Sequence, residues 1–375
     1  MVILENPYVS DSLLAYLEES QLPVLKNKFV ENRVSENNSL NLVEENQFIE
    51  EYQKRKKVYT VSEYALGWVN ASLNDAELKR QVTLLKDKTA FREASAYLYP
   101  DFFFYELSYE ELLAYDVSNL QLPVILKPSI GFLSKGVYTI LNEEDWKEAL
   151  IDIKKDIEEG TNPFPTSVVR NDVFIVESYI KGKEFAVDIY FNDKKPVIVN
   201  IFEHPFSSAK DVSDRLYVTS KAIFDQYLTP FTEFMTRLNE ALQLDHIPIH
   251  IELRVDGDNI MPIEINPLRF TGMCLNEINF HITGKHPLHY FFTNSTPDYS
   301  AMWKDKENDS YCFSILEKPN ASEKDSLDLD SALKTYSNIL ELRRVNNPKL
   351  AIQAFVFSKT NQEEELQEIL NLKMQ

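Results

Sequence analysis

The stretch HIELRVDGDNIMPIEINPLRFTG, residues 250–272, carries the pattern that decides the fold of this chain. Apolar and polar residues alternate through residues 249–255 and again through residues 263–266, which is typical of strands with one buried face. The intervening Asp-Gly-Asp-Asn, residues 256–259, is a hairpin-turn sequence. If both apolar faces enter one core, the polar face of this two-stranded ribbon gathers Glu252, Glu264 and Asn266.

Two carboxylates and an amide oxygen on neighbouring strands suit a hard cation such as Mg²⁺, because no cysteine lies among them. Arg254 and Arg269 flank the group, and an arginine fork suits phosphate or carboxylate. The alternative is a hairpin whose polar face meets only water, since such alternation is the norm for half-buried strands. Taken alone, this stretch leaves both interpretations open.

The composition narrows the class of protein. A chain of 375 residues is long enough for two or three domains. Its net charge of −20 argues against general binding to nucleic acid or to an anionic membrane. The two cysteines offer neither a disulfide framework nor zinc spacing, and the N-terminus lacks a signal-peptide pattern. With no apolar run long enough for a membrane helix, we expect a cytoplasmic protein.

The first part of the chain predicts a small α/β domain with a parallel sheet. Short apolar segments at residues 2–4, 24–25 and 58–61 alternate with helical patterns. Residues 31–47 are rich in asparagine and glutamate and are expected to form a loop. No G-x-G-x-x-G is present, so a dinucleotide-binding fingerprint is absent.

The middle of the chain offers a candidate phosphate site. Residues 123–128 read as a strand that ends near Lys127, and a loop containing Ser134 and Gly136 follows it. Such a loop can fold over a phosphate chain and offer backbone N–H groups, while the lysine supplies a point charge. The alternative is an ordinary hairpin with a solvated lysine.

Other elements of the middle and end of the chain are predicted from periodicity. Residues 75–98 are expected to be helical, residues 102–104 a buried strand, residues 206–227 loop-rich, and Pro230 the start of an amphipathic helix. After residue 300 we expect strands at 311–316 and 350–357, helices at 333–345 and 361–372, and a solvated helix face at Glu363-Glu364-Glu365.

Four separated motifs together resemble the ATP-grasp superfamily. In chain order they are Lys88 before Phe91, Lys127 with its Ser/Gly loop, the Glu177-x-x-Ile180-x-Gly-x-Glu184 connection, and Glu252 with Glu264-x-Asn266. The resemblance covers roughly residues 80–285. It implies an α/β (α+β) fold in which two α+β subdomains clasp ATP, preceded by a small Rossmann-like parallel-sheet domain. The expected boundaries are residues 1–85, 86–175 for the small subdomain, 176–300 for the large subdomain, and 301–375 for an extension packing on it.

The resemblance also implies residue roles. Lys88 and Lys127 match lysines that touch ATP phosphates, and Ser134 and Gly136 belong to the phosphate-covering loop. The adenine hinge matches Glu177, Ser178, Tyr179 and Ile180, and Glu184 matches the acid that binds the ribose. The metal ligands match Glu252, Glu264 and Asn266, holding Mg²⁺ or alternatively Mn²⁺. Arg269 matches the arginine beside the reacting group, and we assign Arg254 to the catalytic site because it shares the face of Glu252.

Ile130, Phe132 and Leu133 occupy a loop that is often glycine-rich in the family, which puts in question how tightly it closes.

The implied activity is a ligase that uses ATP and Mg²⁺ to activate a small-molecule carboxylate as an acyl phosphate and joins it to an amine. Carboxyphosphate or carbamoyl-phosphate chemistry is an alternative, and so is a non-catalytic ATP-binding regulator. P-loop and protein-kinase motifs are absent. Whether the chain forms a homodimer, and whether His204 and Arg215 contact substrate or phosphate, stays open.

Overall fold

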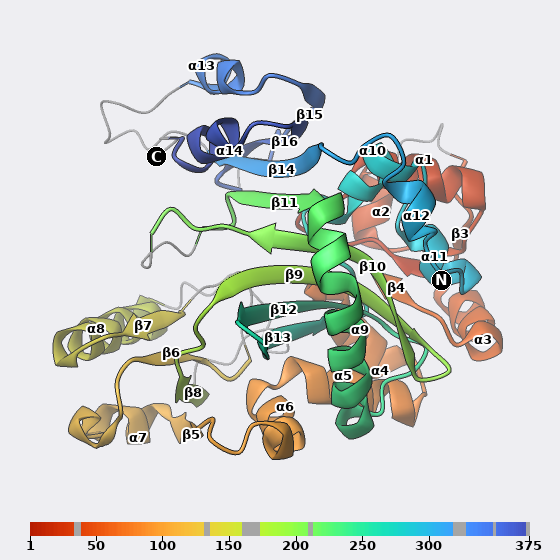
Figure 1. Ribbon diagram of the computed structural model, residues 1–375. Coiled ribbons are helices and arrows are strands. Elements are labelled where there is room, and N and C mark those ends of the chain that lie inside the picture. The colour runs from red at the N-terminus through yellow and green to blue at the C-terminus, as the bar shows by residue number, and fades with distance from the viewer. Residues whose placement is uncertain are drawn as a thin grey trace.

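The computed structural model describes residues 1–33, 39–130, 136–159, 173–208, 213–317, 328–347 and 350–372, and these residues form three sheets (Figure 1). The first sheet is parallel with the order β3-β2-β1-β4, as the N-terminal pattern predicts. Its strands are β1 Val2–Ile3, β2 Val24–Leu25, β3 Leu42–Val43 and β4 Tyr59–Thr60, and its helices are α1 Asp11–Ser20, α2 Lys28–Arg33 and α3 Glu45–Arg55.

The helices after β4 confirm the helical prediction for residues 75–98 and add a break inside it. They are η1 Glu63–Ala65, α4 Leu66–Ser72, α5 Ala76–Lys86, α6 Lys88–Ser95 and η2 Ala96–Leu98. Asp87 ends α5 and caps α6, because its carboxylate accepts from the backbone N–H groups of Thr89 and Ala90. The break places Lys86 and Lys88 at adjoining helix ends, and α5 packs against the second strand of the hairpin.

A second, antiparallel sheet has the order β5-β8-β6-β7. Its strands are β5 Phe104–Ser108, β6 Val124–Pro128, β7 Tyr138–Ile140 and β8 Val173–Ser178, with α7 Tyr109–Ala114, η3 Val117–Asn119 and α8 Glu143–Glu159. The predicted buried strand at 102–104 is wrong in position and burial. The strand begins at Phe104 and lies at the sheet edge, where Tyr105 is 52% exposed.

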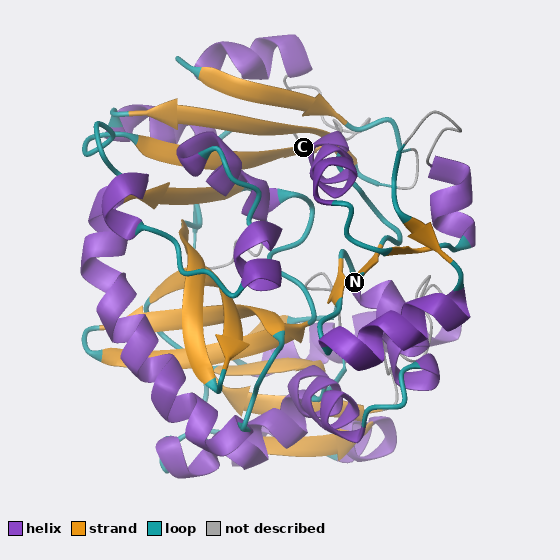
Figure 2. Ribbon diagram, turned by 90° about the vertical axis from the view of Figure 1, so that its right-hand side faces the viewer, coloured by secondary structure: helices purple, strands orange, loops and turns teal. Residues whose placement is uncertain are grey.

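The third sheet has eight strands in the order β13-β12-β9-β10-β11-β14-β16-β15. The strands are β9 Lys183–Asn192, β10 Lys195–His204, β11 Leu216–Ser220, β12 Pro248–Asp256, β13 Asn259–Pro267, β14 Ser310–Glu317, β15 Ile339–Arg344 and β16 Ile352–Thr360. The helix α9 Lys221–Leu242 packs along one face of this sheet (Figures 1 and 2). Strands from beyond residue 300 therefore continue the sheet that begins with the hairpin.

The remaining helices are η4 Leu275–Glu277, α10 Ile278–Thr283, α11 Leu288–Thr293, α12 Tyr299–Met302, α13 Leu329–Ala332, η5 Leu333–Thr335 and α14 Glu363–Leu370. The predicted helix at the chain end and the strands near 311–316 and 350–357 are confirmed. In the described part of the chain, no helix combines the length and apolarity needed to cross a bilayer.

Five further local predictions are wrong. Residues 31–47 include β3 and the start of α3, whose buried face is carried by Phe48 and Tyr52 beyond the polar segment. The helix expected from Pro230 begins at Lys221, and residues 206–227 include β11, because Ser220 caps the helix through the N–H of Ile223.

The other two wrong predictions lie near the C-terminus. The segment 333–345 contains η5 and strand β15, where leucines alternate with charged residues in the period of a strand. In the acidic run of α14, Glu365 is buried and accepts from the N–H of Ser337 and the hydroxyl of Thr360, so this side chain is not solvated.

Candidate active site

The hairpin of β12 and β13 brings the three predicted metal ligands together. Glu252 pairs directly with Glu264 across the ribbon, and Asn266 pairs with His250. The side-chain amide of Asn266 donates to Glu264 Oε1 at 3.2 Å. Two carboxylates and an amide therefore share one face of a rigid two-stranded ribbon.

Cations from the preceding helices and from the following segment face these carboxylates. Lys88 Nζ lies 3.1 Å from Glu264 Oε2. Arg269 donates through Nη2 to Glu63 Oε1 at 3.2 Å, and the second oxygen of Glu63 pairs with Lys86. Glu63 and Lys86 were missed by sequence reasoning.

The electrostatics of the two opposed glutamates differ. Burial and the nearby charge of Glu264 raise the pKa of Glu252. Burial also acts to raise the pKa of Glu264, but Lys88, Lys127 and Lys86 outweigh it and hold that pKa well below its usual value. Glu264 is thus an anion in a field of lysines, and Glu252 would be further stabilised as an anion by an added cation.

This donor set fits Mg²⁺. Among the described residues, no group of three or more histidine, cysteine, aspartate and glutamate side chains gathers around one point. The hairpin would therefore supply two carboxylates and an amide oxygen and leave the other positions to phosphate oxygens and water. Mg²⁺ is usually bound in this way, through one or two carboxylates together with substrate phosphates.

A buried histidine lies beside the pair. His250 Nε2 is 3.4 Å from Glu252 Oε1, and its Nδ1 is 3.0 Å from Thr271 Oγ1. Asp188 accepts from both the backbone N–H and the hydroxyl of Thr271. Burial lowers the pKa of His250, but Asp188 and Glu252 outweigh it and raise this pKa overall. This cluster orients Glu252 and fixes the segment that carries Arg269.

Lys127 and Glu177 form a second charged group, between the small sheet and the hairpin. Glu177 is buried and pairs with Lys127 at 2.7 Å and with Arg92 Nε at 2.8 Å. Burial would raise the pKa of Glu177, but Arg92 and Lys127 lower it to about 2. Arg92 also donates to the carbonyls of Pro262 and Ile263 on β13. Arg92, which sequence reasoning missed, therefore ties the small sheet to the hairpin.

The segment predicted as the adenine hinge runs from β8 to β9. The backbone N–H of Ser178 donates to the carbonyl of Phe103. Arg254 donates to the carbonyl of Ile180 at 2.6 Å, and its guanidinium lies 5.3 Å from the centre of the Tyr179 ring. Gly182 has φ +109°, and a Cβ there would lie 2.1 Å from the carbonyl oxygen of Val255, so the close approach of this turn to β12 requires glycine.

Glu184, the predicted ribose ligand, lies at the start of β9. Its carboxylate accepts from Arg254 Nε at 3.0 Å and lies 3.1 Å from His204 Nδ1. Burial opposes ionisation, but His204 and Arg254 lower the pKa of Glu184. His204 thus contacts the predicted nucleotide residue, whereas Arg215 donates to the carbonyl of Leu370. Arg254 lies on the same strand as Glu252, and its side chain contacts the hinge and Glu184.

The phosphate-covering loop lies largely outside the described residues, and Ser134 is among the residues not described. Gly136 follows it with φ +72°, in the left-handed region that favours glycine. Ser129, before the loop, donates to Asp87 at 3.2 Å and so ties the end of β6 to the start of α6.

One pocket runs along the polar face of the hairpin and is lined by Glu252, Glu264, Asn266 and Arg269. The N-terminal domain adds Tyr8 and Ser62 to its walls, and β14 adds Phe313 and Ile315. The candidate site is therefore built from three parts of the chain that are far apart in sequence.

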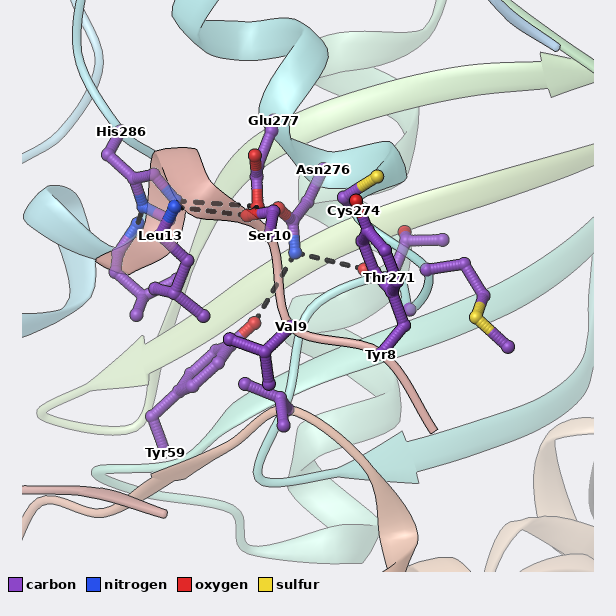
Figure 3. Close-up of a pocket in the computed structure, with 14 residues that line it drawn as sticks. Tyr8, Val9, Ser10, Leu13, Tyr59, Thr271, Cys274, Asn276, Glu277 and His286 are labelled. Atoms are coloured by element: carbon purple, nitrogen blue, oxygen red, sulfur yellow. Dashed lines mark hydrogen bonds and ion pairs between the residues drawn. The ribbon is translucent and has the colours of Figure 1, made fainter. Parts of the chain in front are cut away.

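A neighbouring pocket shares Tyr8, Thr271 and Met273 with the first and is shown in Figure 3. There the side chain of Asn276 donates to the carbonyl of Thr271 and to the hydroxyl of Tyr59. Tyr59 in turn accepts from the backbone N–H of Phe270. These bonds hold the segment after β13 in place, and with it the side chain of Arg269.

Known proteins share features with this chain in both sequence and fold. Residues 120–277 match the family model described as an ATP-grasp domain. No curated protein sequence matches the chain at a significant level. Among solved structures, an L-amino acid ligase from Bacillus licheniformis is similar with a TM-score of 0.71 and 15% identity, over 98% of this chain and 95% of that one.

Two further solved structures are similar over nearly the whole chain. N5-carboxyaminoimidazole ribonucleotide synthetase from Thermotoga maritima has a TM-score of 0.63 and 14% identity, over 98% of this chain and 96% of that one. The biotin carboxylase domain of the Hydrogenobacter thermophilus 2-oxoglutarate carboxylase, solved with MgADP and bicarbonate, has a TM-score of 0.61 and 11% identity, over 96% of this chain and 86% of that one. Residues 120–277 therefore match an ATP-grasp domain, and the chain shares the fold of these similar structures, which confirms the predicted resemblance and fold class.

Proposed function

We propose that the protein is an ATP- and Mg²⁺-dependent ligase that activates a carboxylate as an acyl phosphate and joins it to an amine of an amino acid or peptide, releasing ADP and phosphate. The observation that carries the proposal is the direct pairing of Glu252 with Glu264 in one pocket with Arg269, where Lys88 faces Glu264. Opposed carboxylates with adjoining cations suit a metal-bound phosphate chain.

The proposed nucleotide site runs from the hinge to the hairpin. Backbone groups of Glu177, Ser178, Tyr179 and Ile180 would read the adenine, and Glu184 would accept from the ribose hydroxyls. Lys88 and Lys127 would contact phosphate oxygens, and Ser134 and Gly136 would cover them. Arg254 positions Glu184 and the Ile180 carbonyl, so we assign it a positioning role beside the nucleotide.

The metal ligands would be Glu252, Glu264 and Asn266, and a bound Mg²⁺, or Mn²⁺ in its place, would neutralise charge on the β- and γ-phosphates. The ammonium of Lys88 contacts Glu264 in the structure, so it is placed to contact a phosphate oxygen of a nucleotide bound beside the hairpin. His250 and Asp188 hold Glu252 and Thr271 in position.

The reaction requires no protein nucleophile. An oxygen of the substrate carboxylate attacks the γ-phosphorus, the bond to the β-phosphate oxygen breaks, and ADP leaves. The amine then attacks the acyl carbon, phosphate leaves with the oxygen that bridged carbon and phosphorus, and the amine loses a proton. The cations orient the groups and stabilise the developing negative charge, and Arg269 lies beside the predicted metal ligands.

A carboxyphosphate enzyme is the second candidate, because the similar structures include a biotin carboxylase domain solved with bicarbonate. The test is ADP release with pools of amino acids, with bicarbonate, and with or without Mg²⁺. The ligase requires release that depends on Mg²⁺, a carboxylate and an amine together. Release with bicarbonate alone favours carboxyphosphate chemistry, and ATP binding without release in any pool favours a regulator.

A cytoplasmic location and a homodimer stay proposals. The location is supported by Cys274 and Cys312, which are both unpaired and buried.

A further inference from the structure

We propose that the pocket beside the hairpin selects a carboxylic acid with an apolar side chain, and that Ser62 and Arg269 hold its carboxylate. This inference rests on the proposed ligase function and names the substrate class of the same site. It also gives a role to strand β14, which lies outside the residues matched by the ATP-grasp model.

Two buried donors in this pocket lack a partner among the described residues. Ser62 is 3% exposed and Arg269 is 7% exposed, and in the described part of the chain neither Ser62 Oγ nor Arg269 Nε has a hydrogen-bond partner. Leaving such buried donors unpaired is unfavourable, because each has lost its hydration without gaining a partner. Both residues line the pocket, so a ligand with acceptor oxygens would satisfy the two donors there.

The position of Ser62 links these donors. Ser62 precedes η1 without capping it through its side chain. The next residue, Glu63, accepts from Arg269 Nη2. The N-terminal domain therefore presents a hydroxyl and, through Glu63, orients a guanidinium at the same pocket. A hydroxyl and an arginine suit the two oxygens of a carboxylate.

The rest of the pocket has an apolar wall, and Asp214, His250 and Thr271 are its polar members. Tyr8 comes from the N-terminal domain, Met273 and Leu275 follow the hairpin, and Phe313 and Ile315 come from β14. Phe313 is buried and stacks on Phe355 with ring centres 5.5 Å apart, so this wall is firmly supported. The polar members already have partners, because Asp214 accepts from the Tyr217 hydroxyl and His250 contacts Thr271 and Glu252. A polar or charged side chain placed against the apolar wall would lose hydration without gaining partners.

The predicted metal ligands determine the orientation of the substrate in the pocket. Glu252 and Glu264 line the same pocket as Ser62 and Arg269. The carboxylate held by these donors therefore lies beside the predicted γ-phosphate position, and the apolar walls receive the remainder of the molecule. Bicarbonate has no group that would fill them.

The first test compares leucine with asparagine, which is close to it in shape but polar. With Mg-ATP and a mixed amine pool, we expect the kcat/KM for leucine-dependent ADP formation to exceed that for asparagine by at least about tenfold. Equal rates with the two acids, or release driven by glutamate or bicarbonate instead, would overturn the apolar class while ATP turnover itself persisted.

Variants test the two halves of the pocket separately. Ser62→Ala should raise the KM for leucine about tenfold and leave the KM for ATP unchanged. The matched control is Ser118→Ala, at an exposed serine, which should leave both KM values unchanged. Ile315→Thr should lower the ratio of kcat/KM for leucine to that for asparagine. Ile339→Thr makes the same change at the exposed first residue of β15 and should leave this ratio unchanged. A Ser62→Ala variant with an unaltered KM for leucine contradicts the assignment of Ser62.

Thermal stability with ligands separates this inference from the ligase proposal. Stabilisation by MgADP reports the nucleotide site, and added leucine reports the pocket without requiring turnover. If no acid releases ADP, the ligase proposal fails, and leucine stabilisation that is lost in Ser62→Ala still supports the pocket. If acids release ADP but leucine and asparagine stabilise equally, the pocket inference alone fails.

Discussion

The carboxylate of Glu264 has Lys88 on one side and Glu252 across the ribbon. Glu264→Gln keeps the shape and removes the charge, so we expect at least a hundredfold loss of kcat with a native thermal transition. Steady-state ADP release measures the effect. Asp258→Asn makes the same change at the exposed turn of this hairpin and should retain activity. Wild-type turnover in Glu264→Gln would exclude Glu264 as a metal ligand.

Glu177 gives a pH dependence whose sign can be worked out. Arg92 and Lys127 overcome its burial and lower its pKa from 4.5 to about 2. The unfolded chain therefore binds this proton more readily, and the contribution to stability is present above pH 4.5 and lost as the pH falls towards 2. Urea unfolding across this range should show the decline. In Glu177→Gln the free energy of unfolding should fall less steeply over the same pH range. An equal fall in the variant and the wild-type protein would contradict the assignment of this pH dependence to Glu177.

At the scale of elements, β15 pairs with β16 in the sheet, and a buried ion pair also connects it to η4. Arg343 donates to Glu277 at 2.6 Å, and Glu277 also accepts from Ser10 at the start of α1. Arg343→Met leaves Glu277 buried without its guanidinium partner, which should lower the free energy of unfolding by about 3–5 kcal/mol. Chemical denaturation measures this difference.

The adjacent residue offers a matched control. The side chain of Arg344 is 57% exposed and lies 3.6 Å from an exposed Asp330. Because exposed pairs contribute about 0–1 kcal/mol, Arg344→Met should change stability little. Equal losses in the two variants would show that the contact between Arg343 and Glu277 does not hold β15 in place.

Elements differ in how far the sequence predicts them. The hairpin was predictable because alternation and turn residues agree over a continuous stretch, and its register then places Glu252 opposite Glu264. Strand β15 and the first turns of α9 were missed because tertiary pairing and a serine cap outweighed local helical and proline signals. The sequence likewise could not show Glu63 and Arg92 at the site, since their partners lie 206 and 85 residues away.

At the scale of the whole molecule, the site joins the N-terminal domain, the small sheet and the large sheet. Arg92 and Glu177 connect the small sheet to β13, and Glu63 connects the N-terminal domain to Arg269. A nucleotide that bridges these parts should stabilise the fold as a unit. At one hundred times its dissociation constant, MgADP should add about 2.7 kcal/mol to the free energy of unfolding.

Calorimetry or dye-based melting measures this shift. Chelation of Mg²⁺ should reduce it, and Glu264→Gln should reduce it even when Mg²⁺ is present. A shift that is the same with and without Mg²⁺ would contradict a metal site at the hairpin.

The most direct test of the central claim follows an oxygen atom. Leucine labelled with ¹⁸O in its carboxylate is incubated with Mg-ATP and an amine acceptor, and the released phosphate is analysed by mass spectrometry. An acyl-phosphate ligase transfers one carboxylate oxygen to phosphate, so we expect one ¹⁸O in each phosphate formed by ligation. Ligation accompanied by unlabelled phosphate would contradict the account.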